Sequence, residues 1–558
     1  MTSILYRGGS VHSAADPFAE AILVDDGVVA WLGADDTADG LAARADRVID
    51  LDGALVTPGF VDSHVHVLET GLALAAVDLS AGAGVRSAAE ALAALAAGAR
   101  RLDAADPLGT ETLLAFGWDE QTWPERRPLT RTELDDVAGG RPVYAGRVDG
   151  HSAVVSTKLA ASAGVDRLPG GDAPDGILTA DAHHAVRDAS RRMSPERRAR
   201  TQRAALESWA ARGVVSVHEM SGPHLDTHEG LAGIMAQAAD PADGLPHVVA
   251  YRAELCETAD DAAELAALLP FLTGIAGDLT VDGSIGSRTA ALRAPYTDLV
   301  AGPDGTAWYG NLYLSAEEIA NHLIAVAGVG LQGGFHVIGD RAMDEVLAGL
   351  ALAARIGGAG SLRAGRHRLE HALFVDAAAL SSLLLHGVSL SVQPAFDAAW
   401  GGTTGMYASR LGPVRAAALQ PFADLVGAGV PLAFGSDTPV TPVAPWAGVR
   451  AATAHEDPDQ RMSARAAFRA HTRGGWRVAG LDHTGAGELR VGAPAHLAVW
   501  RAGDLTVQTG SERLSRLSSW SREARAGQPL LPDLSEGAPE PECLHTMRDG
   551  VVIHDQLG

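Results

Sequence analysis

Apolar strand segments alternate with alanine-rich helical stretches through most of the middle of this 558-residue chain. Parallel strands that are joined by helices produce such an alternation. The eight strand candidates are residues 59–66, 213–218, 246–252, 278–282, 331–336, 367–373, 388–393 and 431–436. Eight consecutive units predict an α/β fold with a closed (β/α)₈ TIM barrel, in which reactive side chains gather at the carboxyl ends of the strands.

The two ends of the chain, residues 1–56 and 485–558, differ from the middle because they consist of short alternating segments and turns. Near the N-terminus, Asp26-Gly27 stands between two apolar segments and predicts a β-hairpin. We expect the two ends to pair with each other in one small composite β-sandwich domain, beside a barrel formed by residues 57–484.

Residues 70–195 do not follow the alternation of strands and helices. They come directly after the first strand, so we predict an insertion on the face of the barrel that carries the reactive side chains. A long insertion in that position is suited to be a lid or a substrate-binding subdomain.

The charge and the cysteine content exclude several classes of protein. The chain has 69 acidic and 44 basic residues, a formal net charge of −25, which disfavours binding to nucleic acid and to anionic membranes. Other residues interrupt each apolar run before it could span a bilayer, and the N-terminus lacks the pattern of a signal peptide. Two distant cysteines, Cys256 and Cys543, predict no disulfide framework. We expect a cytoplasmic protein whose partners are a small-molecule substrate and, as an option, a second copy in a homodimer.

Four of the eight predicted strands end in residues that can bind a metal ion. The first strand ends in His64 and His66, which point to the same side because strand side chains alternate between faces. Strand five ends in His336, strand six in His371 and strand eight in Asp437. A single histidine on a strand is more often a core or rim residue, but these five residues would meet at one end of a barrel. They predict a site for zinc or another divalent metal ion.

Such a site is typical of hydrolysis by an activated water molecule. A metal-bound water loses its proton near neutral pH, and a carboxylate beside it accepts that proton and returns it to the leaving group. Asp437 is the best candidate for this general base and acid, and His371 is the second catalytic candidate.

Five short stretches carry a resemblance to a known family. They are residues 57–66 (TPGFVDSHVH), 282–290 (DGSIGSRTA), 336–342, 370–371 and 435–437. In these stretches the chain resembles the amidohydrolase superfamily, in particular the branch called amidohydrolase family 3, with YtcJ-like proteins and N-substituted formamide deformylase. The resemblance implies a metal-dependent hydrolase that cleaves amide-like carbon–nitrogen bonds other than peptide bonds (EC 3.5 class), with one or two metal ions per subunit.

One position departs from the family pattern. The resemblance implies a carbamylated lysine on the fourth strand that bridges two metal ions, but the matching residue here is Asp278. Its side chain is too short to reach both ions in the same way. Three outcomes are open: the site holds one metal, Asp278 is not a ligand, or Glu219 or Asp282 partly substitutes for the lysine. A rim carboxylate paired with an arginine is the other interpretation of Glu219. We expect a single zinc-like ion or a weakened second site.

Four further residues are candidates for binding substrate. Trp118 and His151 lie in the insertion, at positions where the family pattern carries similar residues. Arg288 and Arg341 lie just beyond predicted strand ends and could pair with a substrate carboxylate. Ordinary packing is the alternative for the first two residues, and structural ion pairs are the alternative for the two arginines.

Two functional interpretations follow from these observations. The first is hydrolysis of an amide or formamide of a small molecule by metal-activated water, with Asp437 as general base and acid. The second is a non-hydrolytic metal-dependent lyase or isomerase, or a metal- or ligand-binding protein, in which the altered fourth strand has removed hydrolytic activity. The complete set of metal-binding residues at the other strand ends favours the first.

Overall fold

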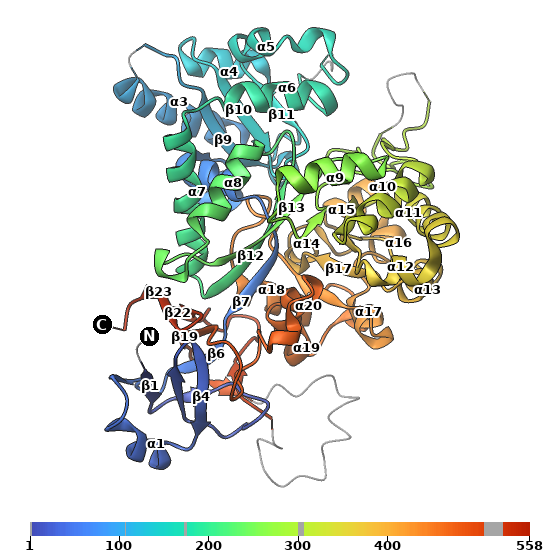
Figure 1. Ribbon diagram of the computed structural model, residues 1–558. Helices are drawn as coiled ribbons and strands as arrows, with labels where there is room; N and C mark the ends of the chain where they lie inside the picture. The colour runs from blue at the N-terminus through green and yellow to red at the C-terminus, as the bar shows by residue number, and fades with distance from the viewer. Residues whose placement is uncertain (1–2, 107, 172–175, 300–305, 507–527, 558) are drawn as a thin grey trace.

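The computed structural model describes residues 3–106, 108–171, 176–299, 306–506 and 528–557. Its centre is one sheet of eight parallel strands with helices outside it (Figure 1). In order around the sheet these are β7 (Phe60–Val65), β12 (Val214–Ser221), β13 (His247–Arg252), β14 (Gly274–Ile275), β15 (Gln332–Val337), β16 (Arg368–His371), β17 (Ser389–Val392) and β18 (Leu432–Phe434). A bridge between Val65 and Thr438 brings the segment after β18 back to β7, which confirms the predicted barrel.

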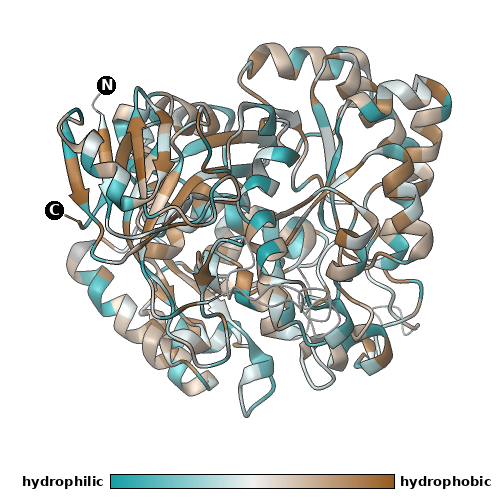
Figure 2. Ribbon diagram, turned by 90° about the horizontal axis from the view of Figure 1, so that it is seen from below, coloured by the Kyte–Doolittle hydropathy of each residue, from teal (hydrophilic) through white to brown (hydrophobic). Residues whose placement is uncertain are grey.

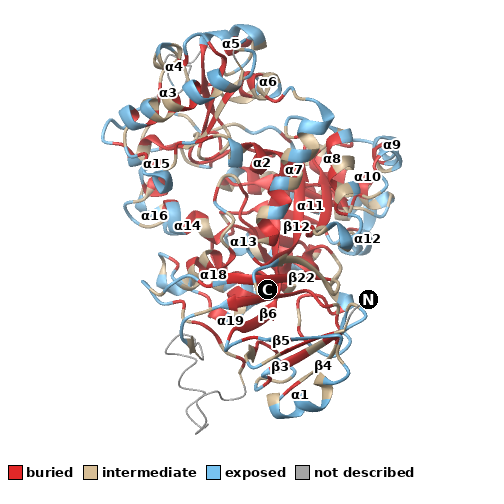
Figure 3. Ribbon diagram, turned by 90° about the vertical axis from the view of Figure 1, so that its left-hand side faces the viewer, coloured by how far each residue is buried: buried red, intermediate tan, exposed pale blue. Residues whose placement is uncertain are grey.

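The strands of the barrel are buried on both faces, as the nearly continuous apolar runs of parallel strands require. Every residue of β7, β12, β15 and β16 is buried. Figure 3 shows this buried centre, with exposed residues on outer helices such as α9 (Ala259–Leu268) and α12 (Ala359–Ala364). The outer helices alternate hydrophobic and hydrophilic residues along their length (Figure 2), because only one side of each packs on the sheet.

One helical segment among the described residues, Asp340–Ala364, is long and apolar enough to cross a membrane by length and composition. The expectation that every apolar run is too short does not hold for it. The segment begins with α11 (Asp340–Ala353), in which Val346 and Leu350 are buried in the main core of the barrel. This part of the segment is therefore a barrel helix.

The fourth strand corrects the sequence prediction. Residues 278–282 were expected to form it, but the strand is the two-residue β14, which pairs with β13 and β15 through Gly274. Gly277 follows with φ of 91°, a backbone conformation that residues with a Cβ rarely adopt. The chain turns there, so Asp278 lies just beyond the carboxyl end of the strand. That end is where barrel enzymes carry their reactive groups.

The two ends of the chain form one composite β unit, as predicted. It has two sheets, of orders β4-β3-β1-β5 and β2-β6-β19-β22-β23. In these sheets β1 is Ile4–Arg7, β2 is Ser10–Val11, β5 is Arg47–Asp50, β22 is Glu542–Arg548 and β23 is Val551–Asp555. The second sheet joins the ends, because β6 (Leu55–Pro58) pairs antiparallel with β19 (Leu497–Arg501). The predicted hairpin joins β3 (Ala21–Asp25) to β4 (Val28–Gly33). Its turn residues, Asp26-Gly27, both have positive φ, which is the geometry of the tightest hairpin turns.

The segment after β7 forms a separate layer above the barrel (Figure 1). The helices α2 (Val67–Ala75) and α7 (Pro195–Ala210) still pack on the barrel and on each other. The chain between these two helices forms a four-stranded sheet. Its order is β11 (Ala153–Val155), β10 (Val143–Arg147), β9 (Leu113–Trp118), β8 (Val77–Asp78). Helices α3 (Ala88–Ala105), α4 (Arg131–Ala138), α5 (Thr157–Ala163) and α6 (Ala180–Ser190) cover this sheet. The predicted insertion is therefore a subdomain with its own core.

Candidate metal centre

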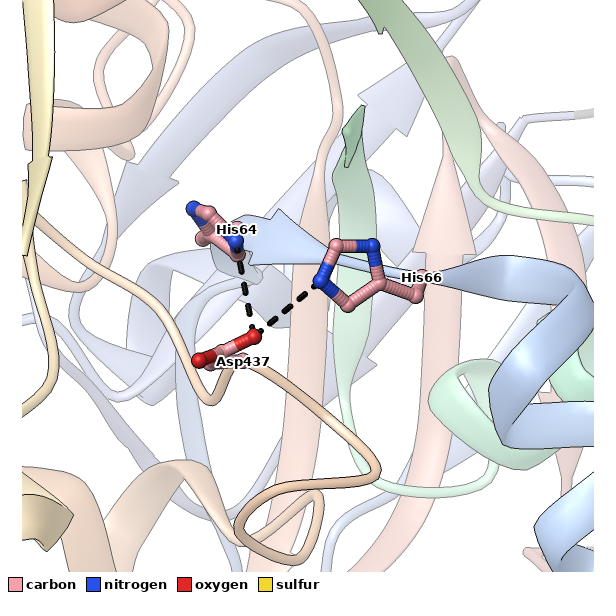
Figure 4. Close-up of side chains that lie close together, drawn as sticks. All are labelled: His64, His66 and Asp437. Atoms are coloured by element: carbon pink, nitrogen blue, oxygen red, sulfur yellow. Dashed lines mark ion pairs between the residues drawn. The ribbon is translucent and has the colours of Figure 1, made fainter. Parts of the chain in front are cut away.

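The first strand aims two imidazoles at the centre of the barrel mouth. His64 is the fifth residue of β7 and His66 follows the strand, and both are buried. Asp437 follows β18, and its backbone N–H donates to the carbonyl of His64 at 2.9 Å. This bond holds the loop after β18 against the end of β7. Figure 4 shows the result, in which the Asp437 carboxylate faces both imidazoles.

The ligand atoms of this group lie close enough to share one ion. Asp437 Oδ1 is 3.4 Å from His64 Nε2 and 3.2 Å from His66 Nε2. Asp278 adds a second carboxylate, with Oδ1 3.4 Å from His64 Nε2 and Oδ2 3.1 Å from His66 Nε2. His371 approaches the same Asp278 Oδ1 from the other side, at 3.8 Å from Nε2. The structure thus brings together four of the five predicted metal ligands and adds Asp278.

Hydrogen bonds on the far side of each ring fix which nitrogen is free. Nδ1 of His64 lies 2.9 Å from the Glu370 carboxylate, and Nδ1 of His66 lies 3.2 Å from the carbonyl oxygen of Met220. Nδ1 of His371 lies 2.9 Å from the Gln393 side-chain oxygen. These oxygens only accept, so each Nδ1 carries a proton and Nε2 is the nitrogen that faces the centre, where its lone pair would be available to a bound cation. Metal-binding histidines are held in this way.

Polar atoms at the centre of this group lack hydrogen-bond partners, as is expected where a cation binds. His64 Nε2 and Asp278 Oδ1 are buried without a hydrogen-bond partner. Burial lowers the pKa of His66, but Asp278 and Asp437 outweigh this and raise it to about 10. Burial likewise opposes ionisation of Asp278, yet His64 and the other imidazoles hold its pKa well below the usual range. The two carboxylates, Asp437 buried and Asp278 18% exposed, face the same two imidazoles, and these residues fit a divalent cation.

His336, the remaining predicted ligand, lies beside this group. Its ring centroid is 4.5 Å from that of His371, and both of its ring nitrogens are buried without a hydrogen-bond partner. Burial and the neighbouring His371 and His151 lower the pKa of His336 well below its usual value. A neutral imidazole with free nitrogens is available at this point of the site.

The other two carboxylates considered for the fourth-strand role are engaged elsewhere. Glu219 accepts a hydrogen bond from the backbone N–H of Val67 at 2.7 Å, which fixes the start of α2 behind His66. Asp282 accepts from three backbone N–H groups, those of Ile338, Gly339 and Ala291, at 2.7–2.9 Å. Glu219 and Asp282 therefore position the chain around the metal-binding residues. Of the three carboxylates considered for the fourth-strand role, Asp278 is the one that faces the imidazoles.

A cavity of about 410 Å³ opens above these residues, between the barrel and the insertion. His66, Asp278, His336, His371 and Asp437 line its floor. The insertion contributes walls from β9, β10, the turn after β10 and α6. A cavity of this size accepts a small molecule.

The four predicted substrate-binding residues separate into two groups. His151 lines the cavity, and its ring centroid is 5.3 Å from that of His336. The other three do not line it. Trp118 is fully buried in the core of the insertion and donates Nε1–H to Ala145 O at 2.9 Å. Arg288 pairs with Asp298 at 2.9 Å and Arg341 pairs with Glu345, so structural contacts occupy both guanidinium groups.

Several residues of the site were not predicted. Gln393 and Glu370 orient metal-binding histidines. The sequence signal for Glu370 is that it directly precedes His371, and the signal for Gln393 is that it directly follows strand β17. Arg187 lines the cavity from α6. Its signal is weaker: His183 and His184 precede it by four and three residues, which is one face of a helix.

Comparison with known proteins identifies the family of the chain. The sequence model of the amidohydrolase family matches residues 47–554. The chain belongs to the amidohydrolase family. It is 27% identical over 471 residues to the YtcJ protein of Bacillus subtilis (strain 168), covering 80% of this chain and 83% of that protein. It is 25% identical over 546 residues to the N-substituted formamide deformylase of Arthrobacter pascens, covering 90% and 93%.

A solved structure has the same architecture. An uncharacterized metal-dependent hydrolase from Pyrococcus horikoshii OT3 superposes with a TM-score of 0.69 at 25% identity, covering 91% of this chain and 99% of that one. The family and this neighbour support a metal-dependent hydrolase with a divalent metal ion.

Proposed function

We propose that this amidohydrolase cleaves a non-peptide carbon–nitrogen bond, an amide or formamide, in a small molecule. One observation carries the proposal: the Nε2 atoms of His64 and His66 each lie 3.1–3.4 Å from oxygens of both Asp278 and Asp437. Three of these residues, His66, Asp278 and Asp437, line the floor of the cavity. The match to a formamide deformylase along 90% of the chain supports the bond class.

We further propose that one ion is held by His64, His66, Asp278 and Asp437. The three-residue groups that could hold a metal among the described residues are His64–His66–Asp437 and His64–Asp278–His371. Both need His64 Nε2, and one lone pair coordinates one ion, so the two groups cannot be filled together. Four nitrogen and oxygen ligands suit zinc.

Proton transfer is assigned to Asp437. When bound, a divalent cation supplies Lewis acidity, which polarises a carbonyl and makes water more acidic. Oδ1 of Asp437 makes both contacts to the imidazoles, which leaves its second oxygen for the proton. Asp437 takes that proton from the attacking water and returns it to the departing nitrogen. His336 is neutral and has free ring nitrogens, so it is suited to hydrogen-bond the carbonyl oxygen of the substrate.

The test pairs metal analysis with a substrate screen. Mass spectrometry of the purified protein is expected to show about one zinc ion per chain, because both possible ligand groups need His64 Nε2. It is expected to hydrolyse members of a panel of N-substituted formamides and amides. Asp437→Asn should lower kcat by about 10²–10⁴-fold, the usual contribution of a general base. Asp36→Asn, an exposed change in the composite β unit, is the control and should leave kcat unchanged.

Two results would overturn the proposal. One is a zinc-loaded protein that hydrolyses no amide or formamide of the panel, which favours the non-hydrolytic interpretation. The other is full turnover by Asp437→Asn, which removes Asp437 from the chemistry.

A further inference from the structure

The wall of the cavity contributed by the insertion carries a cationic side chain that the proposed reaction does not use. Arg187 lies on α6 and lines the same cavity as His66 and Asp437. Its side chain is only 15% exposed. A guanidinium group in such a place is desolvated, so its N–H groups need acceptors.

The carboxylate nearest to Arg187 is already occupied by another arginine. Arg191, one turn further along, donates to Glu69 Oε2 and also donates to the carbonyl oxygen of His224 at 2.8 Å. Arg187 Nη2 is 3.7 Å from the same Glu69 Oε2, which is beyond hydrogen-bond distance. Arg187 Nε and Glu69 Oε1 are both buried without a hydrogen-bond partner. Two guanidinium groups thus face one carboxylate, and the group that faces the cavity is the less satisfied one.

The other cavity charges do not neutralise Arg187. Asp149 accepts from Ser284 and Ser287 and pairs with Arg147 at 3.1 Å. Asp278 and Asp437 face the metal ligands on the floor. Asp181, which also lines the cavity, is exposed to solvent.

The histidines around Arg187 are consistent with an uncompensated positive charge. Burial, then His224 and Arg187, lower the pKa of His184 to about 4. His184 stacks on His224 with ring centroids 4.4 Å apart, and both line the cavity. A neutral His184 beside a guanidinium group can donate a hydrogen bond to a bound anion without adding a second positive charge next to Arg187.

The floor and this wall belong to one cavity, which His151 also lines. His151 is close enough to both parts to be affected by their charges. Its pKa is lowered first by burial, and the charges of both Asp278 and Arg187 act on it. Phe116, Tyr144 and Leu225 supply apolar surface to the cavity. A ligand that spans it would meet the metal ligands at one end and Arg187 at the other.

We propose that the substrate carries an anionic group, such as a carboxylate, at the end remote from its scissile carbon–nitrogen bond, and that Arg187 binds this group. This inference rests on the proposed hydrolase function. Arg187 is a substrate-binding residue that selects anionic amides over neutral ones of the same shape. An arginine fork matches the two oxygens of a carboxylate, whereas a lysine does not.

The test compares matched compounds. N-formyl ω-amino acids of increasing chain length are each paired with the N-formyl alkylamine of the same length, which lacks the carboxylate. Binding to metal-free protein is measured by calorimetry, and kcat/KM is measured for the zinc-loaded protein. At the best chain length the anionic compound should bind at least about tenfold more tightly, the usual effect of a charge-assisted hydrogen bond. In Arg187→Met that preference should vanish, and in Arg187→Lys it should be partly retained.

Arg192→Met is the matched control, because it removes one positive charge from the neighbouring turn at an exposed position. It should keep the full preference. Circular dichroism establishes that each variant is folded. Equal binding of the two series, no binding of any anionic compound, or a preference that survives Arg187→Met would overturn the inference. Anion preference in binding without hydrolysis of any compound would instead overturn the proposed function and leave the anion site standing.

Discussion

Glu370 decides the state of His64 although it faces away from the cavity. Its Oε2 accepts from His64 Nδ1–H, and Arg368 holds the same carboxylate at 2.5 Å and 2.9 Å. Both side chains are fully buried. The Glu370–Arg368 pair therefore fixes the tautomer and orientation of a ligand whose Nε2 is needed by any ion in this site.

Replacing Glu370 should consequently weaken metal binding. In Glu370→Gln the acceptor loses its charge, and the zinc affinity is expected to fall by about 10–100-fold, as for other residues that orient a metal ligand. Competition with a chromogenic zinc chelator measures the affinity directly. Glu317→Gln, an exposed change of the same kind on α10 (Ala316–Gly328), should leave it unchanged. An unchanged affinity in Glu370→Gln would mean that His64 does not ligate the ion through Nε2.

At the scale of elements, the strand ends were predictable and the connections between them were not. Alternation along β7 placed His64 and His66 on one side, and barrel order placed His371 and Asp437 opposite them. The fourth strand was misplaced because β14 is only two residues long, and a Gly277 turn precedes Asp278. Local pattern cannot show where this strand lies, since its pairing with Tyr251 and Gln332 through Gly274 defines it.

The cavity wall was unpredictable for a related reason. The insertion was recognised because it breaks the alternation, but periodicity does not state which of its faces meets the barrel. Arg187 reaches the cavity because α6 is placed over the barrel mouth. Trp118, in contrast, was expected near substrate and is instead a core residue of the insertion. Tertiary docking, which no short window of sequence encodes, decided both outcomes.

The docking itself rests on a few buried contacts. Asp149, just after β10, accepts hydrogen bonds from Ser284 Oγ at 2.6 Å and Ser287 Oγ at 2.7 Å, both in the loop that follows Asp282. The approach at Gly286 is so close that an added Cβ would lie 2.7 Å from the Asp149 carboxylate. These contacts tie the insertion to the barrel beside the metal centre.

The double variant Ser284→Ala, Ser287→Ala should loosen this attachment. Each lost hydroxyl leaves a buried acceptor less satisfied, at a cost of about 1–3 kcal/mol in unfolding free energy. Faster amide hydrogen exchange is expected in β10 and β11, together with a higher KM, because these strands flank the cavity wall. Ser381→Ala, an exposed serine on α13 (Ala377–His386) that bonds within its own helix, is the control. Unchanged exchange in β10 would place the attachment elsewhere.

At the scale of the whole molecule, the barrel is held together partly by histidines that must remain neutral. His322 accepts from the backbone N–H of Cys256 at Nδ1 and contacts the carbonyl oxygen of Ile275 at Nε2, so its ring needs one donor and one acceptor. His367 accepts from the backbone N–H of Gly333 at Nδ1. Burial lowers the pKa of both to about 4. The same direction and value hold for the buried His12 and His496 and for the half-buried His247.

These pKa values set a direction for acid stability. A histidine in the unfolded chain titrates near pH 6.5. Between about pH 6.5 and pH 4 these histidines are therefore protonated in the unfolded chain and neutral in the folded protein. The contribution of these histidines to stability is therefore complete above that window and falls as the pH drops through it, by up to about 1.4 kcal/mol per pH unit for each histidine. Potentiometric titration at pH 5.5 should detect proton uptake on unfolding in urea. His322→Gln should reduce that uptake by about one proton, whereas His483→Gln, at an exposed position, should not change it. Equal uptake in His322→Gln and the unaltered protein would mean that the ring is already charged when folded, and the hydrogen bond from Cys256 would then have to be absent.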